Sequence, residues 1–245
     1  MAPAGLWAHE TGPDDAPLVV LIHGSMDRSA GLLRLSRRLD RRARVLRYDR
    51  RGYGRSIPHD GPFGMDAQVA DLIGLLGERS AVLVGHSYGG DVALATAARH
   101  PSLVSSVVVY EPPLSWLEWW PATTAGGQAL SGEGDPDEAA ERFMRRLIGD
   151  ERWERLPRRT RAARRREGRV MIGELADLRS HAPWTPAEIG VPVVAMAGEF
   201  GAEHHRRGVV YLGESLSDVR TVTIAGARHF GPNTHADAVA AEIAI

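Results

Sequence analysis

Short apolar runs alternate with helix-length segments along most of the chain, and this alternation restricts the fold more than any other feature. Several of the runs are rich in Val and Ile with little polar alternation, as expected where helices cover both faces of a sheet. The pattern therefore predicts an α/β fold with a mostly parallel, doubly wound sheet. We expect its strands at Leu18–Ile22, Arg44–Tyr48, Ala81–Val84, Leu103–Tyr110, Val191–Ala197 and Val219–Ile224.

The segments between these runs have the length and spacing of helices. We expect helices at about residues 30–42, 66–79, 88–100 and 235–245. In the second segment, Val69, Leu72 and Leu76 recur at the spacing that places them on one face of a helix. Asp66 precedes them as a possible N-cap.

The alternation stops between Pro112 and about Glu188, where five of the six Trp and an Arg-rich run at 155–169 occur. Because the strand pattern resumes at Val191, we interpret residues 112–188 as a helical lid inserted into one core domain made of 1–111 and 189–245. Trp116, Trp119 and Trp120 stand at helical spacing. They would either form an apolar substrate-binding wall or pack the lid onto the core. For the Arg-rich run we expect a solvated helix face, with a carboxylate- or phosphate-bearing substrate as the alternative.

Composition excludes several classes of protein. The net charge of −1 favours neither nucleic acid nor an anionic membrane as a partner. Cys is absent, and all 30 basic residues are Arg, so a Cys or Lys nucleophile is impossible. No apolar stretch approaches the roughly 18–20 residues of a membrane span, and Met1–Gly12 does not have the pattern of a secretory signal. We expect a cytoplasmic monomer or homodimer that needs no cofactor. The pair His204-His205 has no third ligand nearby in sequence, so no metal site is expected.

The segment Gly85-His86-Ser87-Tyr88-Gly89 lies between an apolar strand and a helix. This Gly-x-Ser-x-Gly pattern in that context is typical of a sharp turn that projects a nucleophilic Ser from the carboxyl end of a sheet. Gly85 and Gly89 remove side chains that would clash there. The helix that follows directs its N–H groups and its positive dipole end at the same place.

With this motif the chain resembles the α/β-hydrolase family over essentially its whole length. The resemblance extends to Ile22-His23-Gly24-Ser25, where family members place a loop that supplies one oxyanion-hole amide. It extends also to Asp49-Arg50-Arg51-Gly52-Tyr53-Gly54-Arg55-Ser56, a turn to which we assign a structural role. By this resemblance the backbone N–H groups of Ser25 and Tyr88 form the oxyanion hole. His229, after the last predicted strand, takes the place of the catalytic His, and the order Ser, acid, His also fits.

The acid of the triad is less easily placed. Many family members carry Gly-x-x-Asp after the strand that corresponds to Val191–Ala197, but here the sequence is Gly198-Glu199-Phe200-Gly201, with Gly in place of Asp. A second location used in the family directly follows the strand after the nucleophile helix. Glu111 stands there, followed by two prolines that would fix the path of the chain. We choose Glu111, with Glu199 and Glu203 as alternatives, or a Ser–His dyad without an acid.

These assignments predict a serine hydrolase in which Ser87, His229 and Glu111 cleave a carboxylic ester, thioester or lactone through an acyl-enzyme. The substrate would be a small acyl compound. Two alternatives stay open, namely a C–C bond hydrolase that uses the same triad and a binding protein without catalysis. Haloalkane or epoxide opening would need a carboxylate at position 87 and is disfavoured.

Overall fold

The computed structural model describes residues 5–132 and 134–245. Residues 1–4 and Glu133 lie outside this range. The expected core domain and the segment Met1–Gly12 both begin with residues 1–4, and Glu133 belongs to the expected insertion.

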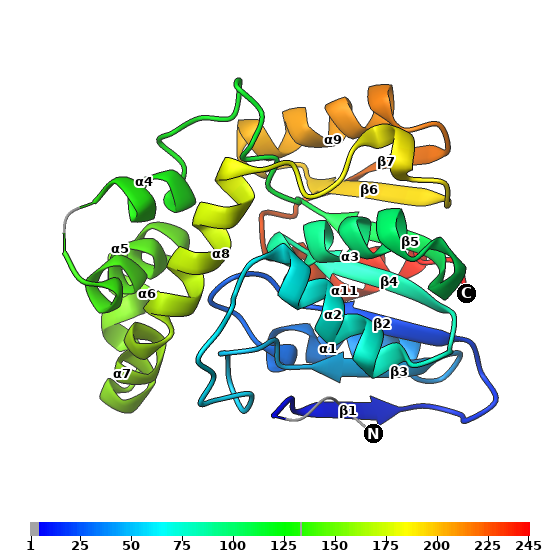
Figure 1. Ribbon diagram of the computed structural model, residues 1–245, viewed down its shortest axis with the longest axis horizontal. Helices are drawn as coiled ribbons and strands as arrows, with labels where there is room; N and C mark the ends of the chain where they lie inside the picture. The colour runs from blue at the N-terminus through cyan, green and yellow to red at the C-terminus, as the bar shows by residue number, and fades with distance from the viewer. Residues whose placement is uncertain (1–4, 133) are drawn as a thin grey trace.

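A seven-stranded sheet forms the centre of the protein (Figure 1), in the order β1-β3-β2-β4-β5-β6-β7. Every neighbouring pair is parallel except β1 and β3. The prediction of a mostly parallel α/β sheet is therefore confirmed. The strands are β1 (Ala8–Thr11), β2 (Leu18–Ile22), β3 (Arg44–Tyr48), β4 (Ala81–His86), β5 (Val104–Tyr110), β6 (Val193–Gly198) and β7 (Val219–Ile224).

Helices cover both faces of this sheet, and the central strands distribute their side chains between two apolar clusters. In β4, Ala81 and Leu83 pack on one face, with α2, α3 and α9, while Val82 and Val84 pack on the other, with α1 and α11. The run shows no polar alternation because both faces are buried. The helices are η1 (Ser29–Leu32), α1 (Leu33–Leu39), α2 (Met65–Leu76), α3 (Tyr88–Arg99), η2 (Pro101–Leu103), η3 (Pro186–Glu188), α9 (Glu203–Ser215), α10 (Gly231–Thr234) and α11 (Ala236–Ala241).

Some local expectations were wrong. The edge strand β1 was missed because four residues that are mostly half-buried carry little periodic signal. The helix expected at 30–42 begins with the 3-10 turn η1. The last helix, expected at 235–245, is the shorter α11, and the short helix α10 before it was not predicted. Asp66 does not cap α2, since Gly64 is the N-cap residue and Asp177 of another helix accepts the N–H of Met65 at 2.7 Å.

The segment between β5 and η3 contains five helices, which gather to one side of the sheet in Figure 1. They enclose an apolar cluster of their own, which includes Phe143, Trp153 and Met171 together with Tyr53 from the core. None of the helices in the described part of the chain is long and apolar enough to cross a membrane. The five are α4 (Ala125–Ser131), α5 (Pro136–Ile148), α6 (Asp150–Arg155), α7 (Arg158–Arg166) and α8 (Gly168–Ser180).

Candidate active site

Ser87 occupies a strained turn between β4 and α3. Its φ of 53° and ψ of −131° lie where non-glycine residues are rare. Two hydrogen bonds hold the turn, from Ser87 N to Tyr110 O at 2.9 Å and from Gly90 N to Ser87 O at 2.7 Å. A Cβ on Gly89 would lie 2.3 Å from the Ile22 carbonyl oxygen, so this close packing requires glycine. The Ser87 side chain is thereby presented at the carboxyl end of the sheet.

The loop after β2 packs directly against Ser87. A Cβ on Gly24 would lie 2.8 Å from Ser87 Cβ, so only glycine allows this approach. Ser25, the next residue, and Tyr88 line the same cavity as Ser87. This brings together the two residues whose amides were expected to form an oxyanion hole. Tyr88 is the first residue of α3, where backbone N–H groups lack intrahelical partners.

Glu111 and His229 meet at the end of β5. Nδ1 of His229 lies 2.7 Å from Glu111 Oε2, and the N–H of Gly198 donates to Glu111 Oε1 at 2.9 Å. The Glu111 side chain is fully buried, whereas that of His229 is 19% exposed. Glu111 has a φ of 49°, a second strained position in the site. The carboxylate is therefore held by β5 on one side and β6 on the other.

The surroundings of Gly201, the position at which the family's more common acid was looked for, leave no room for a side chain. A Cβ there would lie 2.2 Å from Glu111 Oε1, and the φ of Gly201 is one that other residues also adopt. Glu111 itself, rather than the backbone conformation, therefore excludes a side chain at position 201. Of the two alternative acids, Glu199 accepts the N–H of Gly226 at 2.8 Å in an exposed position. Glu203 is exposed at the start of α9.

The loop that carries His229 is anchored to the core by two side chains. His86 Nε2 donates to the carbonyl of His229 at 2.8 Å, and the hydroxyl of Tyr110 donates to that of Arg228 at 2.8 Å. Burial, together with the nearby His229, lowers the pKa of His86 to about 3. The His86 ring therefore stays neutral and can serve as a permanent donor to this loop.

Ser87 and His229 share the wall of a cavity of about 450 Å³. No direct Ser87–His229 hydrogen bond is found among the described residues, and such bonds commonly tighten only when substrate binds. The other side of the cavity comes from the inserted helices, with Leu130, Phe143, Leu147 and Leu175 as apolar lining and Arg146 and Arg179 as cations.

The three Trp expected to bind substrate are separated. Trp120 lines the cavity, but Trp116 packs edge-on against Trp184 at 5.3 Å, and Trp119 packs between Trp120 and Tyr211. The expected helical face does not exist, because Leu114–Trp120 is a series of turns. Of the three residues, only Trp120 is placed to contact a substrate in this cavity.

The Arg-rich run extends from the end of α6 through α7 into α8, and no residue of α7 is buried, so most of the run is solvated as expected. Three of its arginines nevertheless make specific contacts. Arg161 and Arg165 pair with carboxylates of α6 and α5, and Arg164 donates to the carbonyl of Met26 at 2.6 Å. These contacts mainly hold α7 to its neighbours. Met26 directly follows Ser25, so Arg164 also supports the loop next to Ser87.

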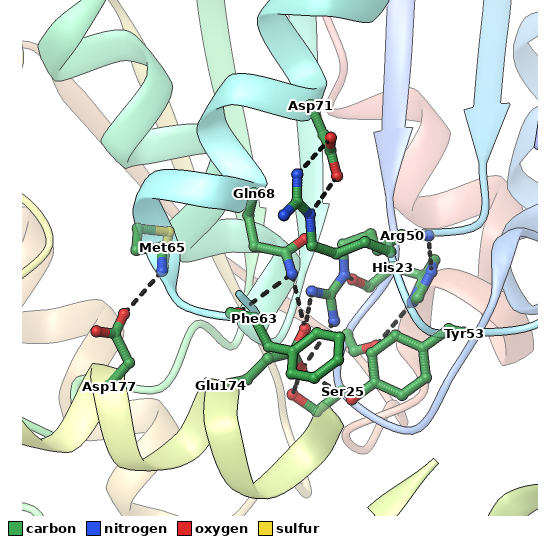
Figure 2. A network of polar contacts seen from close by, with 12 residues as sticks. His23, Ser25, Arg50, Tyr53, Phe63, Met65, Gln68, Asp71, Glu174 and Asp177 are labelled. Atoms are coloured by element: carbon green, nitrogen blue, oxygen red, sulfur yellow. Dashed lines mark hydrogen bonds and ion pairs between the residues drawn. The ribbon is translucent and has the colours of Figure 1, made fainter. Parts of the chain in front are cut away.

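Glu174 of α8 connects the inserted helices to the loop that contains Ser25 (Figure 2). Its Oε2 accepts the hydroxyls of Ser25 at 2.9 Å and Tyr53 at 2.8 Å, and its carboxylate pairs with Arg50, which is also fully buried. Gln68 donates to Oε1 at 3.2 Å. Glu174 was not among the residues predicted from the sequence. Its spacing from Met171 and Leu178, both buried on the same helix face, was the signal that could have identified it.

The structure places the His pair beside His229. The His205 ring stacks on the His229 ring at a centroid distance of 4.8 Å and an interplanar angle of 21°. Glu111, His205 and His229 each offer a ligand atom, and these atoms lie within 4.8 Å of one another. No third ligand was expected because the nearest ones in space are distant in sequence.

Comparison with known proteins agrees with the fold. The sequence profile of the alpha/beta hydrolase family matches residues 19–242. An sn-1-specific diacylglycerol lipase of Danio rerio is 32% identical over 145 residues, which is 57% of this chain and 45% of that protein. The chain thus spans less than half the length of this curated relative.

Two solved structures resemble the protein over nearly its full length. A thermophilic esterase from Thermogutta terrifontis has a TM-score of 0.74 at 20% identity, covering 96% of this chain and 90% of that one. An enol-lactonase from Burkholderia xenovorans has a TM-score of 0.71 at 24% identity, covering 96% and 94%. At these identities the resemblance shows the fold alone. The family profile covers most of the sequence, and the chain therefore belongs to the alpha/beta hydrolase family.

Proposed function

We propose that the protein is a serine hydrolase that cleaves a carboxylic ester, thioester or lactone through an acyl-enzyme. The observation that carries the proposal is the hydrogen bond between Glu111 and His229, in a site where His229 and Ser87 share one cavity. The names of the lipase, esterase and lactonase described above support the same class of reaction.

In the proposed mechanism, Ser87 Oγ attacks the acyl carbon while His229 Nε2 takes its proton. The substrate carbonyl oxygen becomes an oxyanion, which the N–H groups of Ser25 and Tyr88 stabilise. Glu111 accepts the Nδ1 proton of His229. It thereby keeps Nε2 free as the base and stabilises the imidazolium that forms.

The second half of the reaction restores the enzyme. His229 gives its proton to the leaving oxygen or sulfur, and the acyl group stays on Ser87. A water molecule, deprotonated by His229, then attacks the acyl-enzyme and releases the acid. We assign the segment 112–188 the role of a lid over this chemistry, with Trp120 and the apolar residues of α4, α5 and α8 holding the acyl group.

The test is a hydrolysis assay with p-nitrophenyl esters of increasing acyl length, acyl thioesters and lactones, using the parent protein and Ser87→Ala. We expect at least one of these classes to be hydrolysed, with a loss of several orders of magnitude in Ser87→Ala. Equal rates for the two proteins would contradict the proposal. Ring-fission diketones are assayed alongside these substrates, and hydrolysis of the diketones alone would instead favour the C–C bond reaction.

A further inference from the structure

We propose that Glu111, His205 and His229 form a zinc-binding site, and that zinc bound there switches the hydrolase off. The binding itself is independent of the proposed function. The inhibition rests on it, because it concerns the role assigned to His229.

The three side chains converge from separate parts of the chain. Glu111 follows β5, His205 lies in the first turn of α9, and His229 lies in the loop before α10. Their ligand atoms are within 4.8 Å of one another, and the closest pair, His229 Nδ1 and Glu111 Oε2, is 2.7 Å apart. His205 and His229 also line the cavity, so an ion can reach the site from solvent through it.

His205 has coordination capacity that the fold does not use. Its Nδ1 is buried and has no hydrogen-bond partner among residues 5–132 and 134–245. A buried ring nitrogen without a partner is unfavourable, and a metal ion would satisfy it.

Two imidazoles and one carboxylate are a ligand set that suits zinc, with water in the fourth position. Zinc–ligand distances of about 2.1 Å place the ligand atoms of a tetrahedral site roughly 3.4 Å apart. The widest pair here must therefore close by up to about 1.4 Å, and the Glu111–His229 pair must open by about 0.7 Å. His205 must supply this movement and must also turn, because its ring stacks on that of His229 at an interplanar angle of 21° and a metal ion lies in the plane of each ring that binds it. Its position beside the cavity, at the start of its helix, leaves room for this rotation.

Zinc at Nδ1 of His229 would reverse the tautomer that catalysis needs. The neutral imidazole carries one proton, which Nδ1 gives to Glu111 in the proposed mechanism. When zinc occupies Nδ1, that proton must be on Nε2 instead. Nε2 then has no lone pair for the Ser87 proton, and Glu111 is held by zinc rather than by the ring. The protein would lose its general base without losing any residue.

The test uses protein without a polyhistidine tag and zinc chloride as the probe. Calorimetry measures zinc binding to the parent, to His205→Ala and to His204→Ala. His204 is the matched control, because its ring is 4.4 Å from that of His205 and lines the same cavity without belonging to the proposed ligand set. Both substitutions lie at the start of α9, where Ala favours the helix. Ester hydrolysis is then measured against zinc, each variant relative to its own metal-free rate.

We expect one zinc per chain, full inhibition that a chelator reverses, and no effect of magnesium, which disfavours imidazole ligands. His205→Ala should bind zinc at least about tenfold more weakly and need at least that much more zinc for inhibition. His204→Ala should match the parent. Equal zinc affinity in His205→Ala and the parent, or stoichiometric binding without inhibition of an active enzyme, would overturn the proposal. Zinc binding that depends on His205, in a protein that hydrolyses nothing when metal-free, would contradict the proposed function but support the site.

Discussion

The proposed catalytic acid can be moved from position 111 to position 201 by two substitutions, Glu111→Ala and Gly201→Asp. This pair tests whether the two positions can serve the same role. The two locations compete for one volume, since a Cβ on residue 201 would lie 2.2 Å from Glu111 Oε1. Gly201→Asp in the parent should therefore lower both activity and stability, the latter by about 1–3 kcal/mol from overpacking. In a Glu111→Ala background the side chain that fills this volume is gone, and the Gly198 carbonyl oxygen, 3.0 Å from the added Cβ, is the close neighbour that remains. The same substitution should then raise activity.

The size of the effect follows from what Glu111 contacts. Its oxygens accept one hydrogen bond each, from His229 Nδ1 and from Gly198 N. In Glu111→Gln, the amide oxygen would accept the Gly198 N–H, and the NH₂ group would face His229. The ring would then present its Nδ1 lone pair to the amide and carry its proton on Nε2. A wrong tautomer of this kind costs about 10⁴ in kcat, or roughly 5.5 kcal/mol.

The assay compares kcat/KM for Glu111→Ala, Gly201→Asp and the double variant, with urea unfolding as the control for folding. The expected result is a change of sign, in which Gly201→Asp is harmful alone and beneficial together with Glu111→Ala. Additive effects, or a double variant no more active than Glu111→Ala, would refute the idea that the two positions share one role. Near-parental activity of Glu111→Gln, with Glu199→Gln or Glu203→Gln inactive, would refute the choice of acid.

Three further substitutions test other parts of the account. Glu174→Gln should lower the free energy of unfolding, measured in urea, by about 3 kcal/mol, because it leaves Arg50 buried without its counter-charge. It should also lower kcat more than it changes KM, because the loop that contains Ser25 loses its contact with the Glu174 carboxylate. Asp91→Asn should raise the free energy of unfolding at pH 8 by about 1–2 kcal/mol, since burial raises the pKa of Asp91 and its carboxylate has no partner among the described residues. The gain should disappear below about pH 3, where the carboxyl group is protonated in both states because its unfolded pKa is about 3.9. A gain that persists there would contradict this reasoning. The His86 ring stays neutral in the native protein down to its pKa of about 3, whereas in the unfolded chain it takes up a proton below about pH 6.5. The contribution of His86 to the free energy of unfolding is therefore complete above about pH 6.5 and is smaller by about 2 kcal/mol at pH 5. His86→Asn should remove this part of the pH dependence in urea titrations, and an unchanged dependence on pH would contradict the assignment.

The strands were the most predictable part of the fold. Three of them, Leu18–Ile22, Arg44–Tyr48 and Val219–Ile224, have the predicted bounds, because turn residues or helix-like segments limit each apolar run. β1 was not predictable in this way. Its sequence, Ala-His-Glu-Thr, pairs along one edge only and carries no apolar run.

The site was predictable where local pattern determines position. Ser87 directly follows β4 and Glu111 directly follows β5. Because parallel neighbours bring their carboxyl ends to one edge of the sheet, the sequence pattern was enough to predict that the two residues lie at the same edge. The neighbours of Trp116, by contrast, depend on how turns fold in three dimensions, and the stacking of His205 on His229 depends on where α9 begins. Glu174 was predictable in part. The helix periodicity indicates that it is buried, but it does not indicate which residues contact its carboxylate.

The central claim is that Ser87 is an activated nucleophile, and covalent labelling tests it most directly. Folded protein treated with a fluorophosphonate should incorporate one label per chain, and peptide mass spectrometry should locate the label at Ser87; His229→Ala should label far more slowly. A folded protein that takes up no label, or takes it up at another residue at the same rate with and without His229, would contradict the account and favour a binding protein built on this fold.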